Sequence, residues 1–213
     1  KVQHEKEKIK SYYVKLLKVI LIVVTPLLAI LFACAGEFVR VVYGIQWLKV
    51  IVPVQIMCAY GLIKTISSIT EPIFLSKGRA DIYLRVNLIR LAIFIPCILI
   101  GVKYGIIGVS IAMLVYSFVT SIPLFQYANK TVGLGNLFFY GVVVKYLILF
   151  VSTVFIVYSI FRLIDINGIL SLPIQRLSIG IGVGILGYFG LGIIIIRDDL
   201  VFAIRFVRRT VQR

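Results

Sequence analysis

The sequence predicts an all-α fold, a polytopic membrane helix bundle with six transmembrane helices. Of the 213 residues, 61% are hydrophobic and 15% are charged, and the mean hydropathy is +1.09. A soluble domain has roughly half of its residues apolar and roughly a quarter charged. Six apolar runs reach the roughly 20 residues that cross the hydrocarbon layer. Because lipid satisfies no backbone groups and the runs are too long for barrel strands, helices are predicted.

The six runs divide the chain into three regions. A basic juxtamembrane segment, residues 1–15, precedes the membrane region, residues 16–196, and a basic cytoplasmic tail, residues 197–213, follows it. The predicted spans cover about 16–36, 50–70, 82–102, 106–127, 138–161 and 177–196. Lys103-Tyr104-Gly105 is predicted to form a tight turn between the third and fourth spans.

The basic residues predict that both ends of the chain are cytoplasmic. With the amino terminus inside, the inner connections hold 17 lysines and arginines and the outer connections hold five, which leaves Lys64 within a span. Short cytoplasmic connections are the ones enriched in these residues. The net charge of +15 does not indicate nucleic-acid binding, because the charges cluster at the ends of apolar runs, where lipid headgroups lie.

Cysteine and histidine form no catalytic or metal-binding pattern. Cys34, Cys58 and Cys97 lie inside apolar runs without metal-ligand spacing, so they are predicted to be small buried hydrophobic side chains. The only histidine, His4, lies in the leading charged segment. We expect no metal, no cofactor and no enzymatic activity. The chain begins at Lys1 rather than Met, which suggests a piece of a longer protein.

A polar stripe in the second span holds the first candidate site. Its members, at i, i+4, i+7, i+8 and i+11 on one helix face, are Tyr60, Lys64, Ser67, Ser68 and Glu71. Lys64 lies about 10 Å from the inner end of the span at 1.5 Å per residue. An intramembrane charge costs several kcal/mol unless it is paired or hydrated, so by default it indicates function. The stripe favours a hydrated cavity in which Lys64 binds an anionic group beside the serines; the alternative is a lysine that snorkels to the interface.

The third span contributes a second candidate cation. Arg90 lies two turns into the span, three residues after Asn87 on the same face. A cavity-facing guanidinium would bind a phosphate through two parallel hydrogen bonds. The alternative is an arginine that pairs with headgroup phosphate and only sets the topology.

Small residues mark two further spans. Ser110, Ser117 and Ser121 fall at i, i+7 and i+11 of the fourth span, where they either line a cavity or form a packing face. The sixth span is rich in glycine and contains a GxxxG pair, Gly180 and Gly184. These glycines are predicted to permit close packing of helices.

Several landmarks occur in order over about residues 12–130. They are a proline-bearing helix at Val24-Thr25-Pro26-Leu27, a G-x-x-W at Gly44–Trp47, a small-x-G-[KR] at Ser76–Arg79 and a G-x-x-G-x-x-x-A at Gly105–Ala112. The set resembles the carboxy-terminal half of the Wzx-type oligosaccharide flippases, in the multidrug/oligosaccharidyl-lipid/polysaccharide exporter superfamily. Ser76 or Lys77 stands where an alanine is commoner in that family.

The resemblance implies a transporter of two six-helix lobes around a central cavity, in the bacterial cytoplasmic (inner) membrane. Its implied substrate is a polyprenyl-diphosphate-linked oligosaccharide for O-antigen, capsule or exopolysaccharide assembly, moved to the outer leaflet by alternating access. The implied partners are this substrate, membrane lipids and the missing amino-terminal lobe, with no nucleic acid. Helix geometry, rather than a family motif, assigns the candidate substrate-binding residues: Lys64 and Arg90 as cations, with Tyr60, Ser67, Ser68 and Ser117 along the path.

Three other functions stay open from the sequence. A drug/cation antiporter of the same superfamily would favour an acid deep in the membrane, whereas the acids near the spans, Glu37, Glu71, Asp165 and Asp198, lie close to span ends. A membrane polymerase or acyltransferase acting on lipid-linked glycans would need polar loops with catalytic side chains, and the outer loops here are short and lack histidine. The third is a purely structural membrane subunit.

Overall fold

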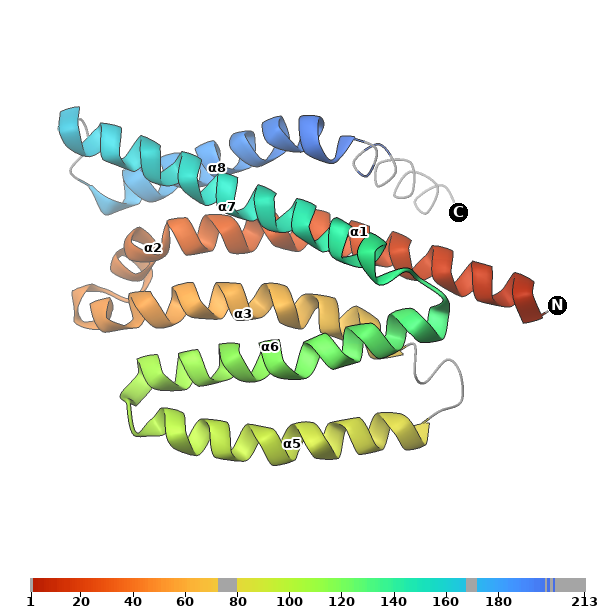
Figure 1. Ribbon diagram of the computed structural model, residues 1–213. Helices are drawn as coiled ribbons and strands as arrows, with labels where there is room; N and C mark the ends of the chain where they lie inside the picture. The colour runs from red at the N-terminus through yellow and green to blue at the C-terminus, as the bar shows by residue number, and fades with distance from the viewer. Residues whose placement is uncertain (1, 73–79, 168–171, 198, 200, 202–213) are drawn as a thin grey trace. The chain divides into compact units, whose positions relative to one another are not determined.

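A computed structural model describes residues 2–72, 80–167, 172–197, 199 and 201 (Figure 1). The elements in chain order are α1 (Val2–Ala33), α2 (Ala35–Val42), the 3-10 helix η1 (Ile45–Val50), α3 (Ile51–Thr70), α5 (Ala80–Val102), α6 (Gly105–Val132), α7 (Asn136–Asn167) and α8 (Pro173–Ile195). Every regular element in these ranges is helical, which confirms the all-α fold class.

Six helical segments are long and apolar enough to cross a membrane, judged by length and composition among the described residues. They are Ile9–Ala33, Ile45–Thr70, Asp81–Val102, Gly105–Val132, Asn136–Ile166 and Pro173–Ile195. The predicted number of spans is therefore confirmed. The structure also makes the basic residues 2–15 helical, because α1 begins at Val2 and continues without a break into the first span.

One face of α5 carries exposed apolar side chains, which indicates a lipid environment. Leu84, Leu88, Leu91, Ile95 and Leu99 are each between 51% and 64% exposed. They are spaced three or four residues apart, so they form one continuous apolar stripe along the helix. A stripe of this length is unfavourable in water and is stable against lipid or another apolar surface.

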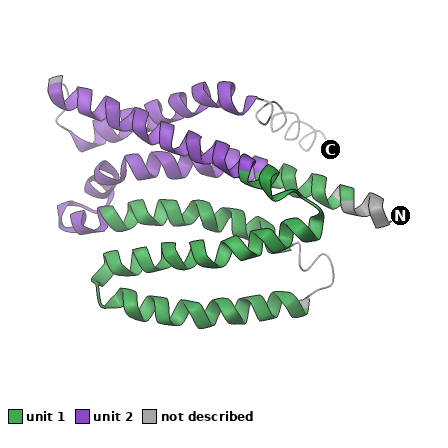
Figure 2. Cartoon of the chain, in the orientation of Figure 1, with its two compact units in different colours: residues 1–17, 52–140 green, residues 18–51, 141–213 purple. Residues whose placement is uncertain are grey.

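The chain forms two compact units, coloured separately in Figure 2. Unit 1 contains residues 1–17 and 52–140, and unit 2 contains residues 18–51 and 141–213. Helices α1 and α7 each contribute residues to both units, and most of α3, with α5 and α6, belongs to unit 1.

The hairpin of α5 and α6 in unit 1 depends on its glycines. Gly105 begins α6 with a φ of +69°, a left-handed conformation that favours glycine. A side chain at Gly108 would collide with the carbonyl oxygen of Gly101, and Ala112 lies against the same Gly101. The predicted turn is present, with the Lys103 and Tyr104 amides donating to Ile100 and Gly101. The small residues of the G-x-x-G-x-x-x-A landmark therefore allow α5 and α6 to pack closely in this hairpin.

Aromatic contacts join the other elements of unit 1 near the end of α3. The Tyr13 ring stacks on Phe139 with centroids 6.4 Å apart, and Phe125 lies 5.4 Å from Phe139. The Tyr13 hydroxyl hydrogen-bonds with the Thr70 hydroxyl at 3.0 Å. These contacts tie the start of α1, the end of α3, the end of α6 and the start of α7 into one packed end of the unit.

Unit 2 is packed around small residues. Its buried core contains Ala33, Cys34, Val157, Phe161 and Ile164. Gly180 of α8 faces Cys34 and Phe161, and Gly184 faces Ile30 and Val157. The GxxxG pair thus forms a helix-packing face, as the sequence predicted.

Helix α2 and η1, which lie in contact, separate α1 from α3. Gly44 precedes η1 with a φ of +90°, and its carbonyl accepts a hydrogen bond from the Trp47 amide at 3.1 Å. The G-x-x-W landmark is therefore a left-handed glycine that starts a 3-10 turn ending on the tryptophan.

Candidate functional site

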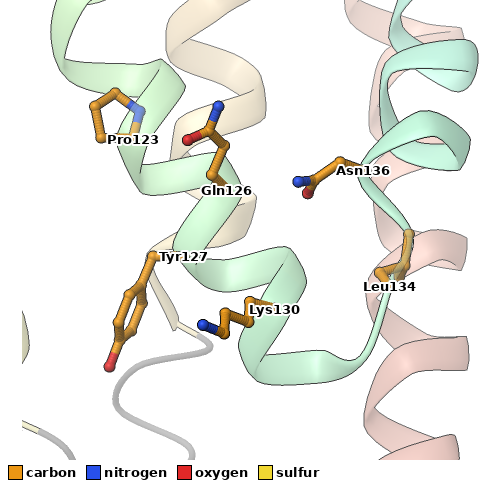
Figure 3. Close-up of a pocket in the computed structure, with 6 residues that line it drawn as sticks. All are labelled: Pro123, Gln126, Tyr127, Lys130, Leu134 and Asn136. Carbon is orange, nitrogen blue, oxygen red and sulfur yellow. The ribbon is translucent and has the colours of Figure 1, made fainter.

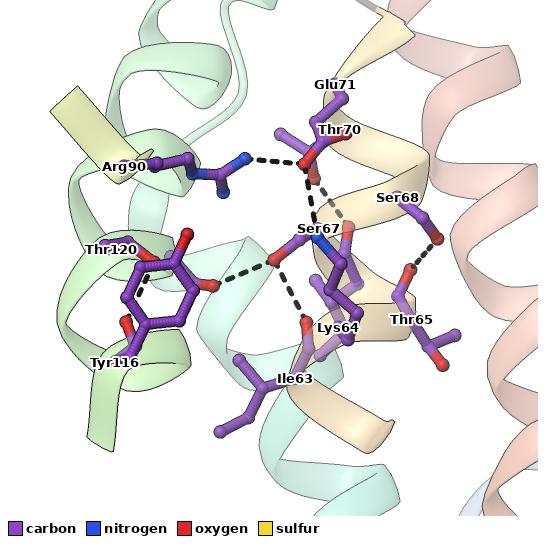
Figure 4. A network of polar contacts seen from close by, with 12 residues as sticks. Ile63, Lys64, Thr65, Ser67, Ser68, Thr70, Glu71, Arg90, Tyr116 and Thr120 are labelled. Atoms are coloured by element: carbon purple, nitrogen blue, oxygen red, sulfur yellow. Dashed lines mark hydrogen bonds and ion pairs between the residues drawn. The ribbon is translucent and has the colours of Figure 1, made fainter. Parts of the chain in front are cut away.

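Three charged side chains meet at one end of unit 1, and we name them the Glu71 cluster: Lys64, Glu71 and Arg90 (Figure 4). The Arg90 Nη1 donates to Glu71 Oε1 at 2.6 Å. The Lys64 Nζ lies 3.9 Å from the same carboxylate oxygen. One carboxylate therefore lies between two cations from two different helices.

Helix register brings these residues together. Lys64 and Glu71 are seven residues apart, so they occupy one face of α3 two turns from each other. The Glu71 amide still donates to the Ser67 carbonyl at 3.0 Å, so the helical hydrogen bonding continues to Glu71, directly after the end of α3. Arg90 reaches the carboxylate from α5.

The two cations differ in exposure and in pairing. The Arg90 side chain is 10% exposed and that of Glu71 is 20% exposed, whereas the Lys64 side chain is 52% exposed. A buried pair at 2.6 Å makes each partner strongly dependent on the other, whereas an exposed pair near 4 Å contributes little. Lys64 is therefore the accessible cation, and Glu71 mainly neutralises Arg90.

Arg90 also has a donor that the cluster leaves unused. Its Nε is buried and has no hydrogen-bond partner in the described part of the chain. A guanidinium presents its donors as a planar fork that fits carboxylate and phosphate oxygens. Glu71 uses one end of that fork, so Arg90 retains the capacity to bind a further oxygen.

The serines of the stripe lie on different sides of α3. Ser67 is buried and hydrogen-bonds with Ser121 of α6 at 2.8 Å, and it donates to the Ile63 carbonyl at 3.1 Å. Ser68 is exposed and donates to the Thr65 carbonyl at 2.8 Å, on the side of α3 turned away from Arg90 in Figure 4. Ser67 thus takes part in the contact between α3 and α6.

The remaining predicted residues lie beside the cluster rather than in it. Ser117 is buried one turn before Ser121 on α6, and Tyr60 is half-buried one turn before Lys64 on α3. Neither makes a hydrogen bond to a member of the Glu71 cluster among the contacts that the structure gives. Their role along a substrate path stays a prediction.

Tyr116 of α6 is a neighbour of the cluster that the sequence did not single out. Figure 4 places its ring beside Arg90, and the ring packs edge-to-face on Phe94 of α5 with centroids 5.2 Å apart. In the sequence, only its position directly before Ser117 could have indicated that Tyr116 lies near the cluster. Across the described ranges, no group of three or more His, Cys, Asp and Glu side chains is arranged to hold a metal ion.

Comparison with known proteins finds similarity to polysaccharide biosynthesis proteins. The model of the family described as "Polysaccharide biosynthesis protein" matches residues 1–52. The lipopolysaccharide biosynthesis protein WzxC of Escherichia coli K12 is 32% identical over 123 residues, which cover 57% of this chain and 25% of WzxC. The resemblance to the Wzx-type exporters is therefore confirmed.

A second similar protein is also a membrane protein. An uncharacterized membrane protein in the cps region of Klebsiella pneumoniae is 29% identical over 137 residues, which cover 64% of this chain and 28% of that protein. The matched part of the chain thus spans about a quarter of the length of these two relatives. No solved structure matches the chain significantly.

The structure and the relatives together describe a multi-pass membrane protein. Its G-x-x-W and G-x-x-G-x-x-x-A landmarks have the structural roles given above. The Ser76–Arg79 landmark lies outside the described residues, as do most of the basic residues of the tail.

Proposed function

We propose that this chain is part of a transporter, and not an enzyme, that moves a polyprenyl-diphosphate-linked oligosaccharide across the bacterial cytoplasmic membrane by alternating access. The observation that carries the proposal is the Glu71 cluster, in which two cations share one carboxylate. The relation to a lipopolysaccharide biosynthesis protein supports the same assignment.

The charge of the cluster suits a diphosphate. Lys64 and Arg90 carry two positive charges and Glu71 carries one negative charge, so one positive charge remains without a carboxylate. In a low-dielectric surrounding this excess attracts an anion far more strongly than it would in water. A diphosphate brings more negative charge than Glu71 supplies.

Binding would proceed from the exposed cation to the buried one. Lys64 is more than half exposed and only 3.9 Å from its partner, so it is the first contact for an incoming phosphate. Arg90 already donates to Glu71, so full binding requires the phosphate to compete with that carboxylate or to use the free Nε. Glu71 would then keep the substrate-free site neutralised until a diphosphate replaces it.

The direction of entry follows from the charge count. The end of unit 1 that holds the Glu71 cluster is the end where α3 stops and α5 begins, and the excess of basic residues supports a cytoplasmic position for this end. A diphosphate in the cytoplasmic leaflet would reach it first. Tyr60 and Ser117 would then contact the sugar deeper along the path.

Substitution of Lys64 tests the proposal in the full-length protein that contains this chain. We expect Lys64→Gln and Lys64→Ala to abolish export of the surface polymer, measured as cell-surface polysaccharide, while the amount of protein in the membrane stays normal. The matched control is Lys103→Gln, which removes an equal charge at the other end of the same unit. Normal export by both Lys64 variants would disprove the proposed role.

A further inference from the structure

A second polar site lies on α6, at the connection to α7. A pocket of about 570 Å³ is lined by Pro123, Gln126, Tyr127, Lys130, Leu134 and Asn136 (Figure 3). Its volume is within the roughly 300–1,000 Å³ of small-molecule sites. It shares no lining residue with the Glu71 cluster, so its role is a separate question.

The pocket is built by two helices and a glycine turn. Four lining residues fall at i, i+3, i+4 and i+7 of α6, which places them on one helix face. Gly133 ends α6 in a left-handed conformation with a φ of +74°, and the chain then turns so that Leu134 and Asn136 form the opposite wall (Figure 3). The side chain of Asn136 extends from the start of α7 toward α6.

The lining favours an anion. Lys130 supplies a positive charge, and none of the lining residues in the described part of the chain is Asp or Glu. Asn136 is the first residue of α7, so the partial positive charge and free amides of that helix end lie at the wall. These features, within a formed pocket, favour a group with negatively charged oxygens.

The amide side chains supply oriented donors. The buried Asn129 donates from Nδ2 to Asn136 Oδ1 at 3.2 Å, which occupies the acceptor of Asn136 and leaves its Nδ2 as a donor. Gln126 of α6 provides a second amide in the lining of the pocket. Amide donors of this kind bind phosphate ester oxygens and hydroxyl groups.

The depth of the pocket matches the headgroup layer. Lys130 is 25 residues beyond the start of α6 at Gly105, which is about 38 Å along the helix at 1.5 Å per residue. The hydrocarbon core is about 30 Å thick, so Lys130 lies beyond it when Gly105 is at the opposite face. Pro123 and Leu134 add apolar walls, and Tyr127 is a residue type enriched at this interface.

We propose that this pocket is a binding site for the phosphate headgroup of an anionic membrane phospholipid. Lys130 pairs with the phosphate, Gln126 and Asn136 donate to the ester oxygens and headgroup hydroxyls, and the apolar walls contact the start of the acyl chains. The site is independent of the transported substrate and of the Glu71 cluster.

Native mass spectrometry of the full-length protein in detergent, titrated with phosphatidylglycerol, tests this site. We expect saturable binding that is about fivefold weaker in Lys130→Gln, from the loss of one cation near an anionic headgroup. Lys130→Arg should bind like the unmodified protein. Lys103→Gln, with the same charge loss at the other end of α6, should also bind normally.

Control ligands distinguish the sources of a phosphate group. Phosphatidylcholine should bind more weakly than phosphatidylglycerol, and inorganic phosphate at millimolar concentration should not displace the lipid. Equal weakening by Lys130→Gln and Lys103→Gln, equal binding of the two phospholipids, or displacement by inorganic phosphate would each overturn the assignment. Displacement of phosphatidylglycerol by polyprenyl diphosphate would assign the pocket to the transported lipid instead and would also overturn it.

Discussion

The two units use charged side chains in opposite ways. In unit 1, the two cations of the Glu71 cluster share a single carboxylate, and Lys64 remains largely exposed. In unit 2, Arg176 lies 2.6 Å from Asp165 and 3.7 Å from Glu37, and it also stacks over the Phe161 ring at 5.7 Å. One cation therefore has two carboxylates in unit 2, where one carboxylate has two cations in unit 1.

The other ion pair described in unit 2 also joins a cation to a carboxylate. Lys18 Nζ lies 2.6 Å from Asp199 Oδ1, and the Tyr146 hydroxyl donates to Asp199 Oδ2 at 3.3 Å. These contacts join α1, α7 and the segment after α8. Elsewhere in unit 2, the helices pack through glycines and apolar side chains.

This difference separates a packing role from a binding role. Charges that are paired between elements join those elements, because each charge already has its counter-ion. Both arginines keep a buried Nε without a hydrogen-bond partner among the described residues, so the two units differ in charge balance, and only the cluster with excess positive charge has capacity for an external anion. The contrast therefore supports the proposal that the Glu71 cluster of unit 1 binds an anion.

The largest expected effect comes from removing the shared carboxylate. Glu71→Ala leaves Arg90 buried without a counter-ion, and we expect the free energy of unfolding to fall by about 3–5 kcal/mol. Thermal unfolding in detergent would measure the change. The double variant Glu71→Ala/Arg90→Met should recover most of the loss, because it leaves no unpaired charge. If Glu71→Ala unfolded at the same temperature as the unmodified protein, the proposed difference in charge pairing between the two units would be wrong.

A smaller effect is expected from the packing face of unit 2. A Cβ at Gly180 would lie 2.5 Å from Cys34 Sγ and 2.7 Å from Phe161 Cζ, whereas a Cβ at Gly182 meets nothing within 4 Å. Gly180→Ala should therefore lower the free energy of unfolding by about 1–3 kcal/mol. Gly182→Ala, two residues away on the same helix, should be neutral or stabilising by up to about 1 kcal/mol. Equal effects of the two substitutions would contradict close packing at Gly180.

The smallest effect is expected at the exposed end of the Arg176 contacts. The Asp165 side chain is 59% exposed, so solvent screens its pair with Arg176 and Asp165→Asn should cost less than about 1 kcal/mol. Arg176 keeps Glu37 and the Phe161 ring as partners. The same thermal measurement checks this, and a loss as large as that of Glu71→Ala would show that the two units depend on their charges equally.

Local features of the chain were predictable because each depends on one segment. The six spans follow from hydropathy and length, and the turn at Lys103-Tyr104-Gly105 follows from its composition. The alignment of Lys64 with Glu71 follows from helix periodicity alone. Residues 35–50 were harder, because short elements such as α2 and η1 carry no periodic signal long enough to assign.

By itself, the sequence determined the helical membrane class, the number of spans and the presence of two cations near one end of consecutive helices. Only the tertiary structure decided that Arg90 meets Glu71, that Ser67 meets Ser121, and that Lys130 faces a pocket. The physical reason is that hydropathy and periodicity orient a helix about its own axis. They do not determine which face of a neighbouring helix it meets, because that depends on packing across the whole unit.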